Sequence, residues 1–376
     1  MITIVFIITI LYLVLIGSFV FGFDKVPDFK LEDIPPKTKF SVIIPFRNEA
    51  EHLHLLLASI SKLNYPKALF EIIFVDDDSE DDSVEKITSI SLSDQNLINI
   101  SILNNSRKTN SPKKDAITTA ISQSKHNWIV TTDADCCLPK YWLDTFDNYI
   151  QHHNAKLLIA PVTLTGVNSF LKRFQLLEIL SLQGVTIGGF GIHKPFLCNG
   201  ANLAYRKDIF KAVKGYEGNS HISSGDDIFL LEKVIKIDKN SVHYIKNKDI
   251  IVTTKPESTF KNLKSQRVRW AAKTSNYNNI FSKLTAIVVL FMNGLLVCLP
   301  FLYVAQIVSL KTLVYSFTIK FLIDFLLIFK SARFFNQGQY LSSFFLSCVF
   351  YPFFSIYVTF ISVFSSYKWK DRAYKK

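Results

Sequence analysis

The sequence predicts an α/β protein with a mainly parallel sheet, attached to membrane segments at both ends. Two observations carry this prediction. Between residues 40 and 160, short apolar runs rich in β-branched residues alternate with helical patterns, which is typical of a parallel sheet covered by helices. Hydrophobic residues make up 49% of the 376 residues, with 33 Phe, and the excess is concentrated at the two ends of the chain. Uncharged apolar stretches of about 20 residues or more indicate membrane spans.

The first 23 residues carry no charged side chain. At about 1.5 Å per helical residue they are long enough to cross a hydrocarbon core of about 30 Å. They lack the basic start and the small-residue cleavage site of a signal peptide, so we expect an uncleaved anchor. A Pro-rich, charged linker follows at residues 24–39, and its lysines favour a cytoplasmic location for the next segment.

The formal net charge is +12. In a membrane protein this balance reflects Lys and Arg beside anionic lipids. With no block of five or six like charges and no zinc-spaced Cys/His set, the sequence does not favour nucleic-acid binding. The five cysteines are odd in number and two are adjacent, which predicts a reduced, cytosolic environment without a disulfide framework.

The sheet is predicted from five apolar runs, and two helical patterns lie between them. The strands are expected at residues 41–44, 72–75, 100–103, 128–130 and 157–160, and the helices at 51–63 and 114–122. Ligands of such sheets bind at the carboxyl ends of the strands. Polar residues follow the first, second and fourth runs at 45–49, 76–79 and 133–135. We expect these clusters to converge on one site.

Asp133 and Asp135 are two residues apart at the end of the fourth run. In a continuing strand their side chains would point to the same face. Such a pair suits a divalent cation that also holds a diphosphate, because Mg²⁺ commonly takes one or two carboxylates plus phosphate oxygens. Taken singly, an Asp-x-Asp also fits an ordinary polar loop.

The strand-end segments, together with three later ones, resemble the motifs of family 2 glycosyltransferases. These motifs are Ser-Val-Ile-Ile-Pro-Phe-Arg-Asn-Glu at 41–49, Val-Asp-Asp-Asp-Ser at 75–79, Asp-Ala-Asp at 133–135, Asn-Gly-Ala-Asn-Leu-Ala-Tyr-Arg at 199–206, Gly-Asp-Asp at 225–227 and Gln-Arg-Val-Arg-Trp at 266–270. The resemblance covers about residues 40–275. It implies the GT-A fold, which is Rossmann-like with a mainly parallel sheet, in a catalytic domain at 40–283.

The resemblance also implies a role for each matching residue. The nucleotide-sugar site would comprise Pro45, Arg47, Glu49, Asp77, Lys113 and Asp133, with Asp77 at the base and Lys113 near the diphosphate. Asp135 would be the main ligand of Mg²⁺ or Mn²⁺, assisted by Asp133. Asp227 would be the general base that accepts the acceptor's proton, and Asp226 would orient it.

Gln266, Arg269 and Trp270 complete the implied catalytic set. They share one face of a helix expected from residue 259 to about 273, where Arg269 could bind diphosphate and Trp270 could stack on a sugar or acceptor. The residues alone leave alternatives open. Lys113 also fits a solvated helix start, the Asp226/Asp227 pair a complement to a helix dipole, and the Trp-containing helix an interfacial helix.

Three positions depart from the family pattern. Asp78 stands where Gly is usual, Pro112 where a Gly often precedes the lysine, and Asp226 where Glu is commoner. All three lie beside the implied functional residues and replace none of them.

Two regions outside the motifs bear on membrane attachment. Residues 169–178 form an amphipathic pattern that we place against the bilayer or near the acceptor entrance, and Gly188, Gly189 and Gly191 predict a mobile loop. Residues 284–310 and 334–367 are long enough to span, but 312–329 carries Lys320 and Asp324 at its centre. Residues 284–376 therefore form a membrane region of two or three spans with a basic tail.

These observations predict an integral protein of the bacterial cell membrane with its catalytic domain in the cytoplasm. Its expected activity is inverting transfer of a sugar from a nucleotide donor, with a UDP-sugar expected, to a lipid or lipid-linked acceptor. A processive polysaccharide synthase is an alternative, because such synthases share Gln-x-x-Arg-Trp. A non-catalytic membrane scaffold that binds nucleotide sugars is another, although the intact Asp135, Asp227, Arg269 and Trp270 argue against it.

Overall fold

The computed structural model describes residues 1–93, 99–220, 222, 224–274, 276–364, 367–369 and 372–374. The chain divides into two compact units. The sheet unit contains Pro27–Thr165 and Leu197–Lys255, and the helical unit contains Met1–Val26, Gly166–Phe196 and Pro256–Lys376. Two parts of the predicted catalytic segment, 166–196 and 256–283, therefore pack within the helical unit.

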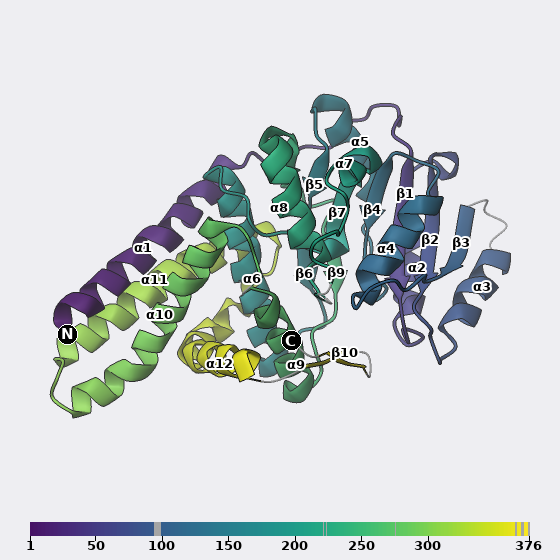
Figure 1. The fold of residues 1–376 in the computed structure, drawn as a ribbon. Coiled ribbons are helices and arrows are strands. Elements are labelled where there is room, and N and C mark those ends of the chain that lie inside the picture. Colours follow the sequence, from purple (N-terminus) through teal and green to yellow (C-terminus); the bar gives the residue numbers. More distant parts are fainter. Residues whose placement is uncertain are drawn as a thin grey trace. The chain divides into compact units, whose positions relative to one another are not determined.

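The sheet unit is built on seven strands in the order β3-β2-β1-β4-β7-β5-β8 (Figure 1). They are β1 (Phe40–Phe46), β2 (Phe70–Asp76), β3 (Asn99–Asn104), β4 (Trp128–Thr131), β5 (Leu157–Ile159), β7 (Leu203–Arg206) and β8 (Val242–Tyr244). Only β7 runs antiparallel to its neighbours among these strands. The predicted mainly parallel sheet is confirmed. A separate parallel pair joins β6 (Val162–Leu164) to β9 (Val252–Thr254).

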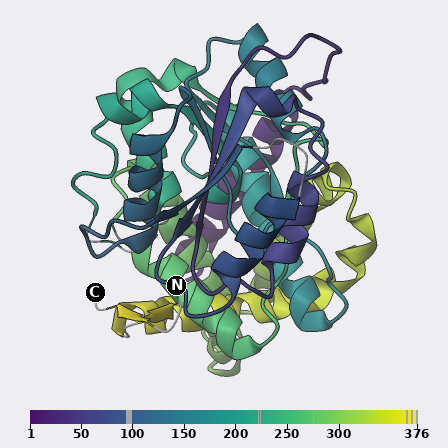
Figure 2. The ribbon, with the colours of Figure 1, turned by 90° about the vertical axis from the view of Figure 1, so that its right-hand side faces the viewer.

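Helices cover both faces of this sheet (Figure 2). They are α2 (Leu53–Ile60), α3 (Ser83–Ser93), α4 (Pro112–Gln123), α5 (Trp142–His152), α7 (Lys207–Ala212) and α8 (Asp226–Asp238). The predicted helix at 51–63 is shorter at both ends, and the one at 114–122 begins two residues earlier. Pro112 opens α4 because the first turn needs no N–H from it and its fixed φ suits a helix.

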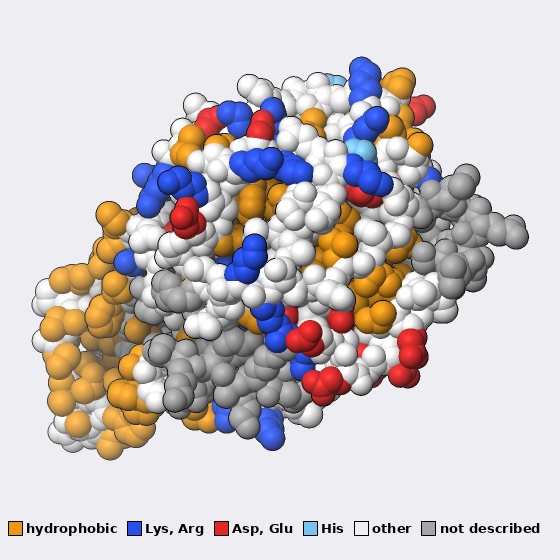
Figure 3. Space-filling view, turned by 45° about the vertical axis from the view of Figure 1, so that its right-hand side comes forward, with side chains coloured by type: hydrophobic (Ala, Val, Ile, Leu, Met, Phe, Trp, Pro, Cys, Tyr) orange, Lys and Arg blue, Asp and Glu red, His pale blue; other side chains and the backbone are white. Residues whose placement is uncertain are grey.

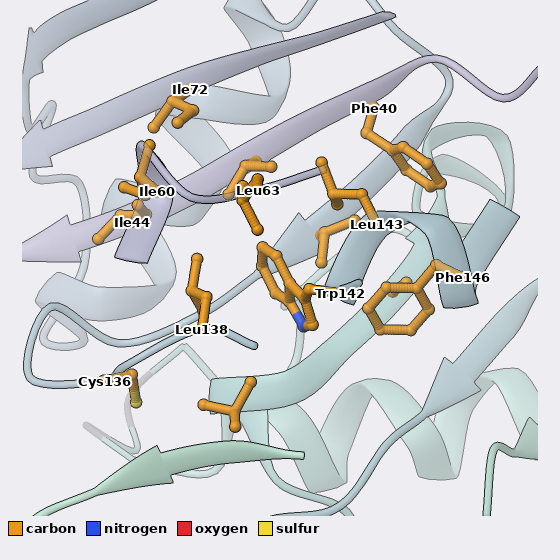
Figure 4. Packing of buried hydrophobic residues seen from close by; sticks show 14 of the residues in the cluster. Phe40, Ile44, Ile60, Leu63, Ile72, Cys136, Leu138, Trp142, Leu143 and Phe146 are labelled. Carbon is orange, nitrogen blue, oxygen red and sulfur yellow. The ribbon is translucent and has the colours of Figure 1, made fainter. Parts of the chain in front are cut away.

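One core lies between the sheet and helices α2 and α5. Side chains alternate between the faces of a strand, so Val42, Ile44 and Phe74 reach this core together. Trp142 at the start of α5 is fully buried in it (Figure 4). Its indole N–H donates to Asn202 Oδ1 at 2.8 Å. This bond ties the segment before β7 to the core and so helps to place the 199–202 turn.

The helical unit contains α1 (Ile2–Lys25), α6 (Phe170–Gly191), α9 (Phe260–Thr274), α10 (Ile280–Val304), α11 (Leu310–Phe334) and α12 (Phe344–Phe364). Among the described residues, four helical segments are long and apolar enough to cross a membrane, namely α1, α10, α11 and Gly338–Phe364. Large hydrophobic side chains are exposed along these helices. Hydrophobic side chains gather at the lower left of Figure 3. By length and composition, the ambiguous segment 312–329 is therefore a third C-terminal candidate span. In the basic tail, β10 (Tyr367–Trp369) pairs with β11 (Arg372–Tyr374), and residues 370–371 and 375–376 lie outside the described residues.

The charged pair in α11 faces the interior of this unit. Lys320 is 2% exposed and donates to Asp324 at 2.5 Å. The Tyr12 hydroxyl of α1 donates to the same carboxylate at 2.6 Å. Charges inside a membrane-type helix are stabilised when they pair and hydrogen-bond within protein. The pair thus links the N-terminal helix to a C-terminal one.

The prediction of a mobile loop at Gly188, Gly189 and Gly191 is wrong. These residues form the last turns of α6, which crosses α1 at Gly22. A Cβ at Gly188 would lie 2.3 Å from the Phe19 carbonyl oxygen, and one at Gly191 would lie 1.8 Å from that of Gly22. The glycines serve close helix packing, since small residues let two backbones approach.

This crossing yields a stability prediction with a matched control in the same helix. Gly22→Ala is expected to lower the stability of the detergent-solubilised protein by about 1–3 kcal/mol, because the new Cβ would lie 2.2 Å from the Gly188 carbonyl oxygen. Gly17→Ala should have little effect, since its nearest neighbour is Ile323 Cδ1 at 4.0 Å. Thermal unfolding midpoints in detergent measure both. Equal midpoints for the two variants would contradict the observed crossing.

Candidate active site

The sheet topology brings the predicted strand-end residues of the sheet unit to one edge. β1, β2, β3 and β4 are parallel, so their carboxyl ends lie on the same side. β7 is antiparallel to β4, and Thr131 is paired with Leu203, so the segment that precedes β7 reaches that same edge. The Thr131 hydroxyl also donates to the Gly200 carbonyl oxygen at 2.8 Å. The site is therefore assembled from strand ends, the 199–202 turn and the start of α8.

Asp77, just after β2, is buried and held by basic and amide groups. Its Oδ1 accepts from Arg107 Nε at 2.6 Å and from Asn105 Nδ2 at 2.8 Å. The guanidinium of Arg107 also contacts Asp78 Oδ2 at 2.6 Å. Arg107 and Asn105 were not expected from the sequence, although both follow the predicted third strand, and that position was the available signal.

Arg47 and Glu49 anchor the neighbouring loop. Arg47 is 9% exposed, and its guanidinium donates to the backbone carbonyls of Asp77 and Asp78 and to Glu80. The Glu49 backbone N–H donates to the Ser83 hydroxyl at 2.9 Å, which fixes the start of the next turn. Pro45 lies in β1 itself, paired with Val75 of β2. Arg47 therefore shapes the loop that carries Asp77.

Two of the departures from the family pattern now have a physical explanation. Asp78 has φ +56°, a left-handed conformation that favours glycine and that Asp tolerates better than most residues. Pro112 occupies the first turn of α4, where proline is well accommodated. Pro112 thus suits its position, whereas Asp78 adopts a conformation that glycine adopts at lower cost.

Lys113 is the centre of the charge cluster. Its ammonium donates to Asp133 Oδ1 at 2.7 Å and lies 3.5 Å from Asp226 Oδ2, while its side chain is 21% exposed. Burial lowers the pKa of Lys113, but Asp133 and Asp226 outweigh that effect and raise the pKa above the ordinary 10.5. The Lys113 ammonium therefore keeps its charge below pH 10.5 and loses it only as the pH rises through the raised pKa. Lys113 is a fixed cation across the neutral range.

Gly200 brings Asp226 and Asp227 against this cluster. The Gly200 backbone N–H donates to Asp227 Oδ2 at 3.1 Å. A Cβ on Gly200 would lie 3.0 Å from Asp226 Oδ2 and 3.6 Å from Lys113 Nζ, so a larger residue would crowd the cluster. As predicted, Gly225-Asp226-Asp227 opens a helix: both carboxylates lie in the first turn of α8, where the N-terminal dipole favours negative charge.

Asp135 lies on the exposed side of the same loop. Thr254 Oγ1 of β9 donates to its Oδ2 at 3.2 Å. Among the described residues, no group of three His, Cys, Asp or Glu side chains is placed to hold a metal by itself. A hard cation bound with a diphosphate needs only one or two carboxylates from the protein. The carboxylates of Asp133 and Asp135 fit that requirement. Because Lys113 already engages Asp133, Asp135 is the better placed direct ligand.

The remaining predicted residues belong to the helical unit. Gln266, Arg269 and Trp270 lie on α9, and Gln266 precedes the other two by about one turn, as the sequence predicted. Gln266 Nε2 donates to Glu257 Oε1 at 2.9 Å. The predicted site residues are thus divided between the units: the aspartates and Lys113 belong to the sheet unit, and these three belong to the helical unit.

The fold is that of the GT-A class of glycosyltransferases. The profile of Glycosyl transferase family 2 matches residues 41–214, and that of Glycosyl transferase family group 2 matches residues 128–369. The second match covers more than half of the chain, and the chain belongs to this family. The fold is similar to that of a solved structure: the mannosyltransferase PcManGT from Pyrobaculum calidifontis, solved in complex with GDP-Man and Mn²⁺, has a TM-score of 0.58 at 15% identity. The match covers 93% of this chain and 98% of that one.

Curated relatives match over part of their length. The poly(ribitol-phosphate) β-N-acetylglucosaminyltransferase TarS of Staphylococcus aureus is 28% identical over 130 residues, which is 35% of this chain and 22% of TarS. The glycosyltransferase AglE of Haloferax volcanii is 27% identical over 190 residues, which is 50% of this chain and 58% of AglE. The chain thus spans less than two thirds of either relative.

Proposed function

We propose that this protein is a membrane-bound inverting glycosyltransferase that moves a sugar from a nucleotide donor to a lipid or lipid-linked acceptor. The observation that carries the proposal is the cluster in which Lys113 joins Asp133 to Asp226 while the Gly200 backbone holds Asp227. A cation for the diphosphate thereby lies beside a carboxylate suited to proton removal. Family membership and the names of the relatives support sugar transfer as the reaction class.

The donor would lie along the carboxyl edge of the sheet. Asp77 would accept a hydrogen bond from the base, in a pocket whose position is set by Arg107 and Asn105. Lys113 would neutralise the diphosphate. Pro45 and Glu49 would line the base side. A UDP-sugar is the first donor to test, and a GDP-sugar the second, because PcManGT was solved with GDP-Man.

The chemical step would be a single displacement. The acceptor hydroxyl loses its proton to the Asp227 carboxylate as its oxygen forms a bond to the anomeric carbon. The bond from that carbon to the diphosphate oxygen breaks at the same time, and the diphosphate leaves with the electron pair. Attack from the opposite side inverts the anomeric configuration. Asp226, held against Lys113, orients the neighbouring carboxylate.

Asp135, assisted by Asp133, would hold a divalent cation. When bound, Mg²⁺ or Mn²⁺ supplies charge that stabilises the departing diphosphate. The Mn²⁺ in the PcManGT complex supports this cofactor. Arg269 would add a second positive charge at the diphosphate, and Trp270 would stack on the acceptor sugar.

The acceptor and the location are inferred from the helical unit. Candidate spans lie at both ends of the chain, which would hold the enzyme at the membrane where lipid acceptors are found. The lysines that follow α1 favour a cytoplasmic sheet unit in a bacterial cell membrane.

Lys113→Met tests the donor site. We expect the donor KM to rise by about ten- to a hundredfold, because a charge-assisted contact of about 1.5–3 kcal/mol is lost. Lys125→Met is the control, since that lysine is 62% exposed and its ammonium lies 3.8 Å from the buried Glu71 carboxylate. Initial rates against donor concentration measure both. An unchanged donor KM in Lys113→Met would show that Lys113 does not touch the diphosphate.

The function itself is tested by incubating membranes or purified enzyme with lipid extract, Mg²⁺ or Mn²⁺ and a panel of UDP- and GDP-sugars. One donor should release nucleoside diphosphate and label the lipid fraction. Product length then separates single transfer from the alternative favoured by Gln-x-x-Arg-Trp, a processive polysaccharide synthase. A long polymer supports the synthase, and one added sugar per acceptor supports the proposal.

A further inference from the structure

A buried ion pair joins α6 to α9 within the helical unit. Arg267 Nε donates to Glu178 Oε2 at 2.8 Å, and the two side chains are 5% and 10% exposed. Arg267 lies between Gln266 and Arg269 in the sequence, yet unlike them it is almost fully covered. It is therefore not positioned to bind a ligand from solvent.

The guanidinium of Arg267 instead contacts two of the three predicted functional side chains on α9. Its NH1 donates to Gln266 Oε1. Its Cζ lies 4.2 Å from the centroid of the Trp270 ring, at i,i+3 spacing on the helix. Stacking of a guanidinium on an indole fixes the plane of the ring as well as its position.

The other end of the Gln266 amide is also fixed. Its Nε2 donates to Glu257 Oε1 at 2.9 Å. Glu257 is held in turn by Gln175 of α6, whose Oε1 accepts from the Glu257 backbone N–H at 2.9 Å and whose Nε2 donates to the Glu257 carbonyl at 3.0 Å. Gln175 and Glu178 lie one turn apart, so one face of α6 sets both ends of the Gln266 side chain.

Apolar side chains also pack α9 within the helical unit. Leu263 and Val268 are buried against Phe174 of α6 and against Phe354 and Val358 of α12. A buried ion pair is weak evidence for stability, because desolvation of the two charges offsets their attraction. A forked, planar cation is well suited to hold an amide and a ring at once, which a lysine cannot do.

We propose that Arg267, oriented by Glu178, is a positioning residue that sets Gln266 and Trp270 in the geometry needed to bind the acceptor. The inference rests on the proposed function for its kinetic consequence, but its structural part can be measured without turnover. Glu178 orients Arg267, and Arg267 in turn orients the two side chains that meet the sugar. This positioning role requires the guanidinium to lie on α9, beside Gln266 and Trp270.

The structural part is tested by labelling the full-length protein with 5-fluorotryptophan. The chain has 4 Trp, and Trp270→Phe identifies the Trp270 signal in the fluorine NMR spectrum. Arg267→Lys and Glu178→Gln should shift that signal. Asp24→Asn should not, because it removes a different ion pair of this unit, with Lys330 at 2.7 Å. An unshifted Trp270 signal in Arg267→Lys would overturn the proposal.

The kinetic part uses a charge swap. Arg267→Lys is expected to raise the acceptor KM by about ten- to a hundredfold through misplacement of Gln266 and Trp270, with the donor KM within about twofold of wild type. The double variant Glu178→Arg/Arg267→Glu restores an ion pair but moves the guanidinium to α6. The thermal stability of this double variant should match that of the wild type, whereas its acceptor KM should be raised as in Arg267→Lys. Recovery of the acceptor KM would show a purely structural ion pair and would overturn the positioning role.

The two proposals fail in different ways. If the wild type turns over no nucleotide sugar, the proposed function fails, and the fluorine spectra still decide whether Arg267 positions Trp270. If the wild type is active but Arg267→Lys changes neither the fluorine spectrum nor the acceptor KM, only the positioning role fails.

Discussion

Replacing Asp227 by asparagine is expected to reduce sugar transfer by about 10²–10⁴-fold, the usual contribution of a general base. The asparagine can still accept the hydrogen bond from the Gly200 N–H, so the turn before β7 should keep its shape. It cannot take up the acceptor's proton. The kcat for transfer should therefore fall, while binding of nucleoside diphosphate, measured by calorimetry, stays within about threefold of wild type.

Asp238→Asn is the matched control for this variant. Asp238 is the last residue of α8, whose first turn contains Asp227, and it pairs at 2.9 Å with Lys156; the two side chains are 31% and 33% exposed. Removing such a pair costs at most about 1 kcal/mol of stability. Transfer by this control should match the wild type. Full activity of Asp227→Asn would remove Asp227 from the role of base.

Asp135→Asn is expected to have the second large effect, through the divalent cation. Loss of outer-shell partners costs about 10–100-fold in metal affinity, so loss of a direct ligand should raise the half-maximal Mn²⁺ concentration by at least about a hundredfold. Wild-type turnover should stop with a chelator and return when Mg²⁺ or Mn²⁺ is added in excess. Nucleotide release titrated with Mn²⁺ measures both effects.

Asp208→Asn controls for the loss of one carboxylate. Asp208 is exposed in α7 of the same unit and pairs with Arg206. The Mn²⁺ concentration required by Asp208→Asn should equal that required by the wild type. Wild-type turnover that persists in chelator would contradict the assignment of Asp135, because the diphosphate would then leave without help from a divalent cation.

The sheet was predictable because its central strands carry their own signal. The runs at 41–44, 72–75 and 128–130 are buried on both faces, and continuous apolar sequence marks such strands. β7 and β8 were not predicted. They are four and three residues long, and their extended conformation depends on pairing with partners distant in sequence.

The site residues could be predicted because they match family motifs. The residues that contact and orient them are visible only in the folded structure. Arg107 meets Asp77 across adjacent strand ends, and Glu178 meets Arg267 across two helices. Contacts of this kind join residues 30 and 89 positions apart, which no local pattern specifies. Gly188 illustrates the opposite error: a glycine that resembles a loop signal lies in a helix because another backbone approaches it.

The most direct test of the proposed activity is the stoichiometry between nucleoside diphosphate released and sugar recovered in the lipid fraction. The two should be equal when the active donor, a divalent cation and the lipid acceptor are present, and both should disappear in Asp227→Asn. A protein that binds nucleotide sugar and metal yet releases no nucleoside diphosphate from any donor, even by hydrolysis, would contradict the account. It would identify the chain as a binding scaffold.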